Sequence, residues 1–217
     1  PKVMKVSTDS VILGAWARIK KDKVLDIGCG TGLLTLMVAQ RFDAVTVHAI
    51  DKDKNAIDCA SGNFANSPFT DRIHLEKSDL FSLSDQSYSS IICNPPYFDQ
   101  LHLSPYQHKN NFRHAEEGFW EHFWLKCDSL LSNQGNLSIV LPYDRSTNLI
   151  TGASETNFKL TRVLSVRTTK DQQPVLICLE YTKGLSRRPI ENDLSIYTEQ
   201  GEWTKQYRSM CREFYIK

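Results

Sequence analysis

Features of membrane and secreted proteins are missing from this sequence of 217 residues. No apolar run approaches the roughly 18 residues of a membrane helix, and the N-terminus lacks a signal-peptide pattern. The six cysteines lie far apart without a CxxC pair, which argues against a disulfide framework or a zinc site. The six histidines show no HxxxH spacing, so we expect no metal. Reduced thiols favour a cytoplasmic protein.

The sequence also lacks a charge excess of either sign. Lysine and arginine number 26 against 25 acidic residues, which gives a formal net charge of +1. Any polyanionic partner therefore has to be held by a local patch rather than by overall charge. Hydrophobic residues make up 41% of the chain, enough for one α/β domain with a sizeable core.

Short apolar strands alternate with helix-length stretches from residue 23 onward. The predicted strands are 23–27, 45–50, 72–76, 89–93, 136–141, 158–167 and 174–181, and the predicted helices are 32–41, 53–65, 117–132, 144–155 and 203–216. Nearly continuous apolar strands are typical of a parallel sheet buried on both faces. The last two strands lack a helix-length connection, so we expect them to pair as an antiparallel hairpin at the sheet edge.

This pattern predicts an α/β doubly wound fold whose seven strands form a mostly parallel sheet with an antiparallel edge hairpin. Such an architecture is typical of the Rossmann-like fold of class I methyltransferases. We expect a single domain over 1–217, in which an N-terminal segment covers 1–22, the core covers 23–182 and a C-terminal extension covers 183–217.

A glycine-rich turn follows the first predicted strand and opens a helix. Gly28, Gly30 and Gly32 carry no Cβ, so the backbone can turn tightly and approach a ligand closely. About twenty residues further on, Asp51 ends the second strand, where a carboxylate can accept hydrogen bonds from ribose hydroxyls. Together they indicate a nucleoside-bearing cofactor, and a bare strand–helix turn is the alternative.

The turn reads Asp26-Ile27-Gly28-Cys29-Gly30-Thr31-Gly32 and resembles motif I, (D/E)xGxGxG, of the class I methyltransferases. The resemblance implies that the cofactor is S-adenosylmethionine and that Asp26 helps to hold its amino-acid end. In that family an acid after the third strand accepts a hydrogen bond from the cofactor's adenine, and Asp79 and Leu80 stand there in this chain. A helix N-cap is the alternative role of Asp79.

A rigid elbow, Asn94-Pro95-Pro96-Tyr97, follows the fourth strand, because two prolines lock φ and remove two backbone donors. The Asn94 side-chain oxygen and the Pro95 carbonyl can each accept one hydrogen of an adenine N6 amino group, which directs the nitrogen lone pair at a methyl donor. Tyr97 can stack on the base. The elbow resembles motif IV, (N/D/S)PP(Y/F/W), of the amino-group methyltransferases, and we expect Asn94 to border the cofactor too. A stiff turn with core aromatics is the alternative.

The N-terminal run MKVSTDSVILGAW closely resembles the opening of the bacterial tRNA1(Val) (adenine-N6)-methyltransferases. The resemblance covers essentially the whole chain and implies methylation of the adenine 3′ of the anticodon, position 37. One departure is Gln173-Pro174, where that family enters the seventh strand through an arginine. Thr8 and Asp9 either cap the helix that follows them or form a lid over the methionine end of the cofactor.

The same elbow serves other substrates, so an rRNA base or a release-factor glutamine is the alternative substrate, and a cofactor-binding scaffold is the non-enzyme alternative. We expect the chain to act on tRNA as a monomer. Clustered lysine and arginine side chains would then hold the phosphates of the tRNA. We expect the clusters at 18–23 and 183–188, with Lys109 and Arg113 of the long segment 98–117, to flank the pocket that receives the base. A third cluster comprises Lys205, Arg208 and Arg212.

Overall fold

The computed structural model describes residues 7–84, 87–95, 109–146, 153, 156–185 and 187–215. Its elements, in chain order, are α1 (Thr8–Trp16), β1 (Asp22–Ile27), α2 (Leu33–Arg41), β2 (Val45–Asp51), α3 (Lys54–Ala65), η1 (Thr70–Arg72), β3 (Ile73–Lys77), η2 (Leu80–Ser82), β4 (Tyr88–Cys93), α4 (Lys109–Leu130), β5 (Leu131–Pro142), η4 (Tyr143–Arg145), β6 (Phe158–Arg167), β7 (Pro174–Lys183), β8 (Ile190–Ser195) and α6 (Lys205–Cys211). The predicted helix over 144–155 falls mostly on residues outside the described ranges.

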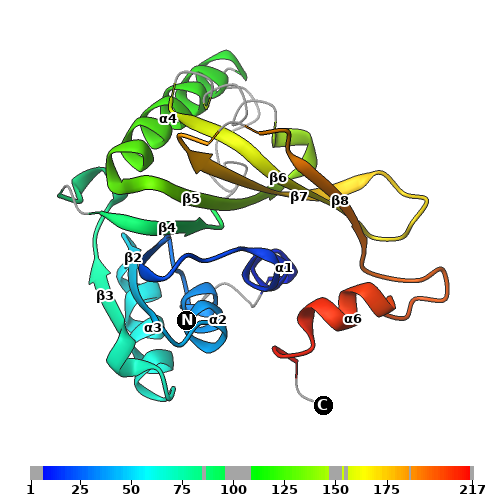
Figure 1. Ribbon diagram of the computed structural model, residues 1–217, viewed down its shortest axis with the longest axis horizontal. Helices are drawn as coiled ribbons and strands as arrows, with labels where there is room; N and C mark the ends of the chain where they lie inside the picture. The colour runs from blue at the N-terminus through cyan, green and yellow to red at the C-terminus, as the bar shows by residue number, and fades with distance from the viewer. Residues whose placement is uncertain are drawn as a thin grey trace.

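The strands form one sheet in the order β3-β2-β1-β4-β5-β7-β6-β8 (Figure 1). The first five strands of this order are parallel, and β7 is antiparallel to both of its neighbours. The expected Rossmann-like α/β fold is confirmed. Its parallel half carries the loops after β1, β2, β3 and β4, and these loops build the site described below.

Two details of the predicted sheet are wrong. The sheet has eight strands, because β8 pairs in parallel with β6, and β8 rather than the β6–β7 hairpin forms the edge. The segment 190–195 reads IENDLS, and its first four residues are exposed. An edge strand that buries little side chain has no apolar run, so hydrophobic patterning did not reveal it.

The two faces of the sheet are covered differently, with α4 on one side and α1, α2 and α6 on the other (Figure 1). On the α4 side the ring of Trp124, which is fully buried, lies 4.7 Å from that of Tyr181 on β7. On the other side α6, shorter than the predicted 203–216, buries Tyr207 and Cys211. No helix among the described residues is long and apolar enough to cross a membrane.

Helix α1 begins at Thr8, and its N-cap is Ser7 rather than Thr8 or Asp9. The Ser7 backbone is extended, and its hydroxyl oxygen accepts a hydrogen bond from the Ser10 amide at 3.3 Å. The capping role considered for Thr8 and Asp9 is therefore wrong, because both already belong to the first turn. At the other end, the Arg162 guanidinium stacks on Trp16 at 4.1 Å and so joins α1 to β6.

We predict that Leu194→Ala destabilises the protein by about 2–5 kcal/mol, because the side chain is 1% exposed and truncation leaves a cavity beneath β8. The matched control on the same strand is Ile190→Ala, which removes a side chain that is 45% exposed and should cost about 1 kcal/mol or less. Urea unfolding of both variants measures the difference. Equal small effects would mean that β8 is not packed onto the core.

Candidate active site

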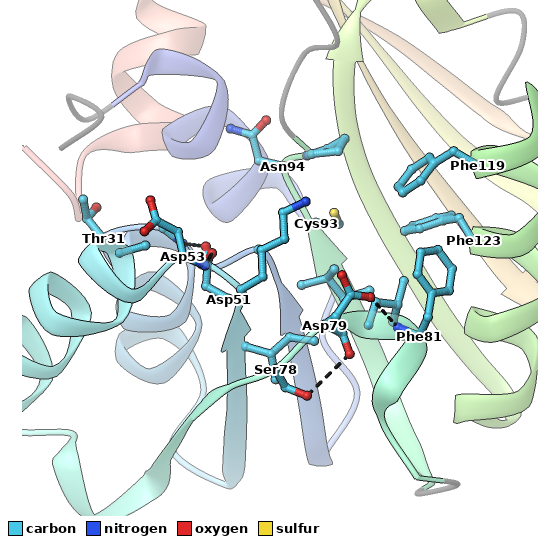
Figure 2. A pocket seen from close by; sticks show the side chains of 18 of the residues that line it. Thr31, Asp51, Asp53, Ser78, Asp79, Phe81, Cys93, Asn94, Phe119 and Phe123 are labelled. Atoms are coloured by element: carbon cyan, nitrogen blue, oxygen red, sulfur yellow. Dashed lines mark hydrogen bonds between the residues drawn. The ribbon is translucent and has the colours of Figure 1, made fainter. Parts of the chain in front are cut away.

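The carboxyl ends of β1, β2 and β4 meet at one edge of the sheet. Ile27 of β1 is in register with Ile50 of β2 and with Cys93 of β4, so the loops after these strands start side by side. A cavity of about 360 Å³ lies there (Figure 2). The sequence-predicted site residues that line it are Gly28, Gly30, Asp51, Asp79, Leu80, Asn94 and Pro95.

The carboxylate of Asp51 holds the glycine turn in place. One of its oxygens accepts a hydrogen bond from the Gly30 amide and the other from the Asp53 amide, each at 2.9 Å. The backbone oxygen of Asp51 accepts from the Ser78 amide at 3.0 Å. The hydrogen bonds of Asp51 thus connect the loops after β1, β2 and β3.

The three glycines of the turn do different things. Gly28 and Gly30 have φ of +69° and +56°, and a Cβ on either would meet nothing within 4 Å, since both face the open cavity. Gly32 has φ of +85°, and a Cβ there would stand 2.2 Å from the ring of Phe64. Gly32 does not line the cavity. It is the N-cap of α2, and its lack of a Cβ lets Phe64 of α3 pack closely against the turn.

Asp26 lies directly beneath the glycine turn. Its side chain is fully buried, and one oxygen accepts a hydrogen bond from the Thr35 hydroxyl at 2.6 Å. The other oxygen has no hydrogen-bond partner among the described residues. Burial, and to a lesser degree the negative charge of Asp51, raises the pKa of Asp26 from 3.8 to about 7. Asp26 is not among the described residues that line the cavity, so a direct contact with a ligand stays a prediction.

The N-cap role considered for Asp79 is confirmed, and its hydrogen bond to the cofactor's adenine stays a prediction. Its side chain caps the short helix η2 by accepting from the Phe81 amide at 2.9 Å, and it also lines the cavity. Leu80, the next residue, is buried and forms part of the cavity floor.

An aromatic wall of Phe81, Phe119 and Phe123 closes one side of the cavity (Figure 2). The rings of Phe81 and Phe119 meet edge to face at 5.9 Å. Sequence reasoning missed these three residues. The spacing of Phe119 and Phe123, one helical turn apart in the run GFWEHFW, was the available signal, but it reads equally well as core packing.

The cavity has an acidic lining. Asp51, Asp53 and Asp79 contribute carboxylates, against the single ammonium of Lys52 among the described lining residues. This balance favours a ligand that carries positive charge over an anionic dinucleotide. Cys93 also lines the cavity, and burial raises the pKa of its thiol well above the usual value.

Asn94 and Pro95 both line the cavity, and Figure 2 shows Asn94 above Cys93. The Asn94 amide nitrogen donates to the Ser10 hydroxyl oxygen at 2.8 Å and approaches that of Ser7 at 3.4 Å. Helix α1 therefore reaches the elbow. Its residues Thr8 and Asp9 are not among the described residues that line the cavity, and Pro96 and Tyr97 lie outside the described ranges.

The basic clusters do not lie where the sequence analysis expected them. Arg18, Lys20 and Arg187 line a different hollow, together with Asn136 of β5. Arg18 and Lys20 precede β1 and Arg187 follows β7, which is antiparallel to β5, so these cations lie at the amino ends of the parallel strands. The expectation that clusters 18–23 and 183–188 flank the base pocket is wrong, because both adjoin the opposite edge of the sheet. The side chains of Lys109 and Arg113 are not among those that the structure describes, so their expected place beside the pocket stays a prediction.

Comparison with known proteins agrees with this geometry. The family model of the methyltransferase small domain matches residues 8–148. A tRNA1(Val) (adenine(37)-N6)-methyltransferase of Vibrio campbellii is 36% identical over 216 residues, which span 99% of this chain and 90% of that protein. One of the same name from Flavobacterium psychrophilum is 34% identical over 223 residues, which span 99% and 93%.

Solved structures share the fold at low sequence identity. A predicted O-methyltransferase from Agrobacterium tumefaciens superposes with a TM-score of 0.75 at 16% identity, covering 94% of this chain and 96% of that one. A SAM-dependent O-methyltransferase from Thermotoga maritima gives 0.61 at 16% identity, covering 87% and 69%. The long matches to curated relatives and the acid-lined cavity beside an NPPY elbow lead to one conclusion. The chain belongs to the tRNA1(Val) (adenine(37)-N6)-methyltransferase family of class I S-adenosylmethionine-dependent enzymes.

Proposed function

We propose that this chain transfers the methyl group of S-adenosylmethionine to N6 of adenine 37 in tRNA1(Val), the substrate that its relatives' names state. The observation that carries the proposal is the position of Asn94 and Pro95 at the rim of the acid-lined cavity. We also propose that the enzyme acts as a monomer in the cytoplasm. It should require no metal ion, because positioning and electrostatics suffice for this transfer.

The cavity fits the cofactor. S-adenosylmethionine supplies an electrophilic methyl group on a positively charged sulfur, and its amino-acid end carries an ammonium. We assign the ammonium end to Asp26, whose second carboxylate oxygen has no partner among the described residues. Gly28 and Gly30 leave room for the ligand against the backbone. Thr8 and Asp9, in the first turn of α1, are proposed as a lid over this end.

The nucleoside end of the cofactor is assigned to the remaining acids. Asp51 would accept hydrogen bonds from the ribose hydroxyls, using the second lone pair of each oxygen that already binds a backbone amide. Asp79 would accept one from the adenine amino group, while Leu80 and Phe81 offer apolar surface to the ring. Gly32 acts indirectly, by setting the start of α2.

The elbow is assigned to the target base. The side-chain oxygen of Asn94 and the carbonyl of Pro95 would each accept one N6 hydrogen, so that the nitrogen lone pair points at the methyl group. Pro96 would keep the elbow rigid, and Tyr97 would stack on the extruded adenine. A base in an anticodon loop can be unstacked at less cost than one in a duplex, which suits a target that must reach Asn94 as a single extruded base.

We predict that Asn94→Ala lowers methyl transfer to tRNA1(Val) by at least about 100-fold while S-adenosylmethionine affinity changes less than about threefold, since Asn94 touches the base. Asn192→Ala, an exposed position on β8, is the matched control and should keep full activity. Tritiated methyl transfer and calorimetry measure the two quantities. A near-normal rate in the Asn94 variant would remove the elbow from the reaction.

The same transfer assay separates the alternative substrates. Unmodified tRNA1(Val), a transcript with guanosine at position 37, bulk rRNA and release factor are offered in parallel, with and without EDTA. We expect label only in the first, and equally with the chelator. Methylation of rRNA or release-factor glutamine instead would replace the proposed substrate, and loss of activity in EDTA would contradict the metal-free reaction.

The raised pKa of Asp26 predicts a pH dependence. An acid with a raised pKa holds its proton in the folded apo protein, so the free energy of unfolding should fall as pH rises from about 4 to about 7. An ammonium beside the carboxylate favours its ionised form. Cofactor binding near pH 7 should therefore release a proton, and affinity should rise with pH up to about 8, where an α-amino group itself loses its charge.

Calorimetry in two buffers with different ionisation enthalpies measures this release. Asp26→Asn should abolish it, weaken binding, and flatten the dependence of melting temperature on pH between about 4 and 7. Asp43→Asn, an exposed carboxylate, is the control and should behave like the unaltered protein. Equal proton release with and without the Asp26 carboxylate would assign the ammonium to another group.

A further inference from the structure

The side-chain amide of Asn94 is held from one side by two serine hydroxyls of another element. Its nitrogen donates to Ser10 Oγ at 2.8 Å and lies 3.4 Å from Ser7 Oγ. The hydroxyls are themselves linked, because Ser7 Oγ donates to Ser10 Oγ at 3.2 Å and accepts from the Ser10 amide at 3.3 Å. Figure 2 shows the Asn94 nitrogen on one side of the amide and its oxygen on the other.

This arrangement decides which end of the amide faces the target. The oxygen and nitrogen of an asparagine have nearly the same size, so a half-turn about the last side-chain bond exchanges an acceptor for a donor at little steric cost. An adenine N6 amino group offers two donors, and only the oxygen end can accept from it. A serine hydroxyl can also donate, but the Ser7 proton is directed to Ser10 Oγ, so Ser7 Oγ can only accept from Asn94. The pair of hydroxyls therefore favours the nitrogen end of the amide and leaves the oxygen end for the target.

We propose that Ser10, assisted by Ser7, is a positioning residue of the methyl-transfer reaction. It holds the Asn94 nitrogen against α1 and leaves the side-chain oxygen to accept from the target amino group. This inference rests on the proposed function, because it concerns how Asn94 presents itself to the base. It gives α1 the role of orienting the Asn94 amide, in addition to the roles proposed for the glycine turn and the elbow.

Helix α1 can serve this purpose because it is anchored independently of the elbow. At its C-terminal end the Arg162 guanidinium stacks on Trp16 and pairs with Glu180 at 2.8 Å in a buried position. Its apolar face is buried against the sheet, with Ile12 and Leu13 fully covered. Ser10 thus projects from a fixed helix onto a residue 84 positions away in sequence.

A helix-capping role alone does not account for the contact. Capping explains why Ser7 Oγ accepts from the Ser10 amide. It does not explain why the hydroxyl of Ser10, a residue inside the first turn, accepts a hydrogen bond from Asn94. Loss of that hydroxyl should therefore affect the reaction more than the fold.

The test compares Ser10→Ala, Ser10→Thr and Ser7→Ala with the unaltered enzyme. We expect Ser10→Ala to lower kcat on tRNA1(Val) about tenfold, the effect of losing one hydrogen bond in the transition state, with unchanged cofactor affinity and melting temperature. Ser10→Thr keeps a hydroxyl and should restore most of kcat. Thr204→Ala is the control for Ser7→Ala, since it removes the cap of α6 far from the cavity and should leave kcat unchanged.

A second measurement does not depend on catalysis. The side-chain NH2 signals of Asn94, assigned by their disappearance in Asn94→Ala, report its hydrogen bonding in a ¹H–¹⁵N spectrum. They should shift and exchange faster with solvent in Ser10→Ala but not in Ser10→Thr. If the unaltered enzyme methylated no tRNA, the proposed function would fail while these signals still tested the contact. Unchanged signals and unchanged kcat in Ser10→Ala would overturn the positioning role.

Discussion

The hydrogen bonds of the Asp51 carboxylate are the constraint on which the rest of the site depends. They tie the glycine turn after β1 to the chain after β2, and the backbone oxygen of Asp51 adds the loop after β3. Hydrogen bonds to a charged acceptor are roughly twice as strong as neutral ones, so one side chain can set the shape of loops that are distant in sequence. The positive φ values at Gly28 and Gly30 are what this geometry requires, and both glycines open onto the cavity as a result.

The Asp51 carboxylate also contributes to the electrostatics of the cavity at the carboxyl ends of the strands. Its charge adds to the burial that raises the pKa of Asp26, and with Asp53 and Asp79 it gives the cavity an acidic lining. Such a lining attracts a sulfonium and an ammonium and repels phosphate. The proposed tRNA substrate would therefore be kept out of the cavity except for one uncharged base, which meets the cofactor at Asn94. The contact of Asn94 with α1 would complete the proposed division between a cavity for the cationic cofactor and a rim for the base.

Much of the fold and part of the site could be predicted from the sequence, and the errors have physical causes. The parallel strands β1, β2 and β4 are mostly buried, so their apolar runs located them to within a residue or so. Strand β8 was not predicted, because an exposed edge strand needs no apolar run. The basic clusters at 18–23 and 183–188 were misplaced because charge along the chain does not say at which end of a sheet it lies. The aromatic wall was missed because Phe119 and Phe123 look like ordinary helix core.

The sequence by itself determined which residue types are available for the chemistry, since the glycine turn, the acids at strand ends and the NPPY motif are recognised from a few consecutive residues each. Only the tertiary structure decided which side chains complete them. The hydrogen bond of Thr35 to Asp26, the packing of Gly32 against Phe64 and the contact between Ser10 and Asn94 join residues from separate elements. Parallel strands connected by helices bring their carboxyl ends together whatever the length of chain between them, and that convergence is a property of the sheet rather than of any one segment.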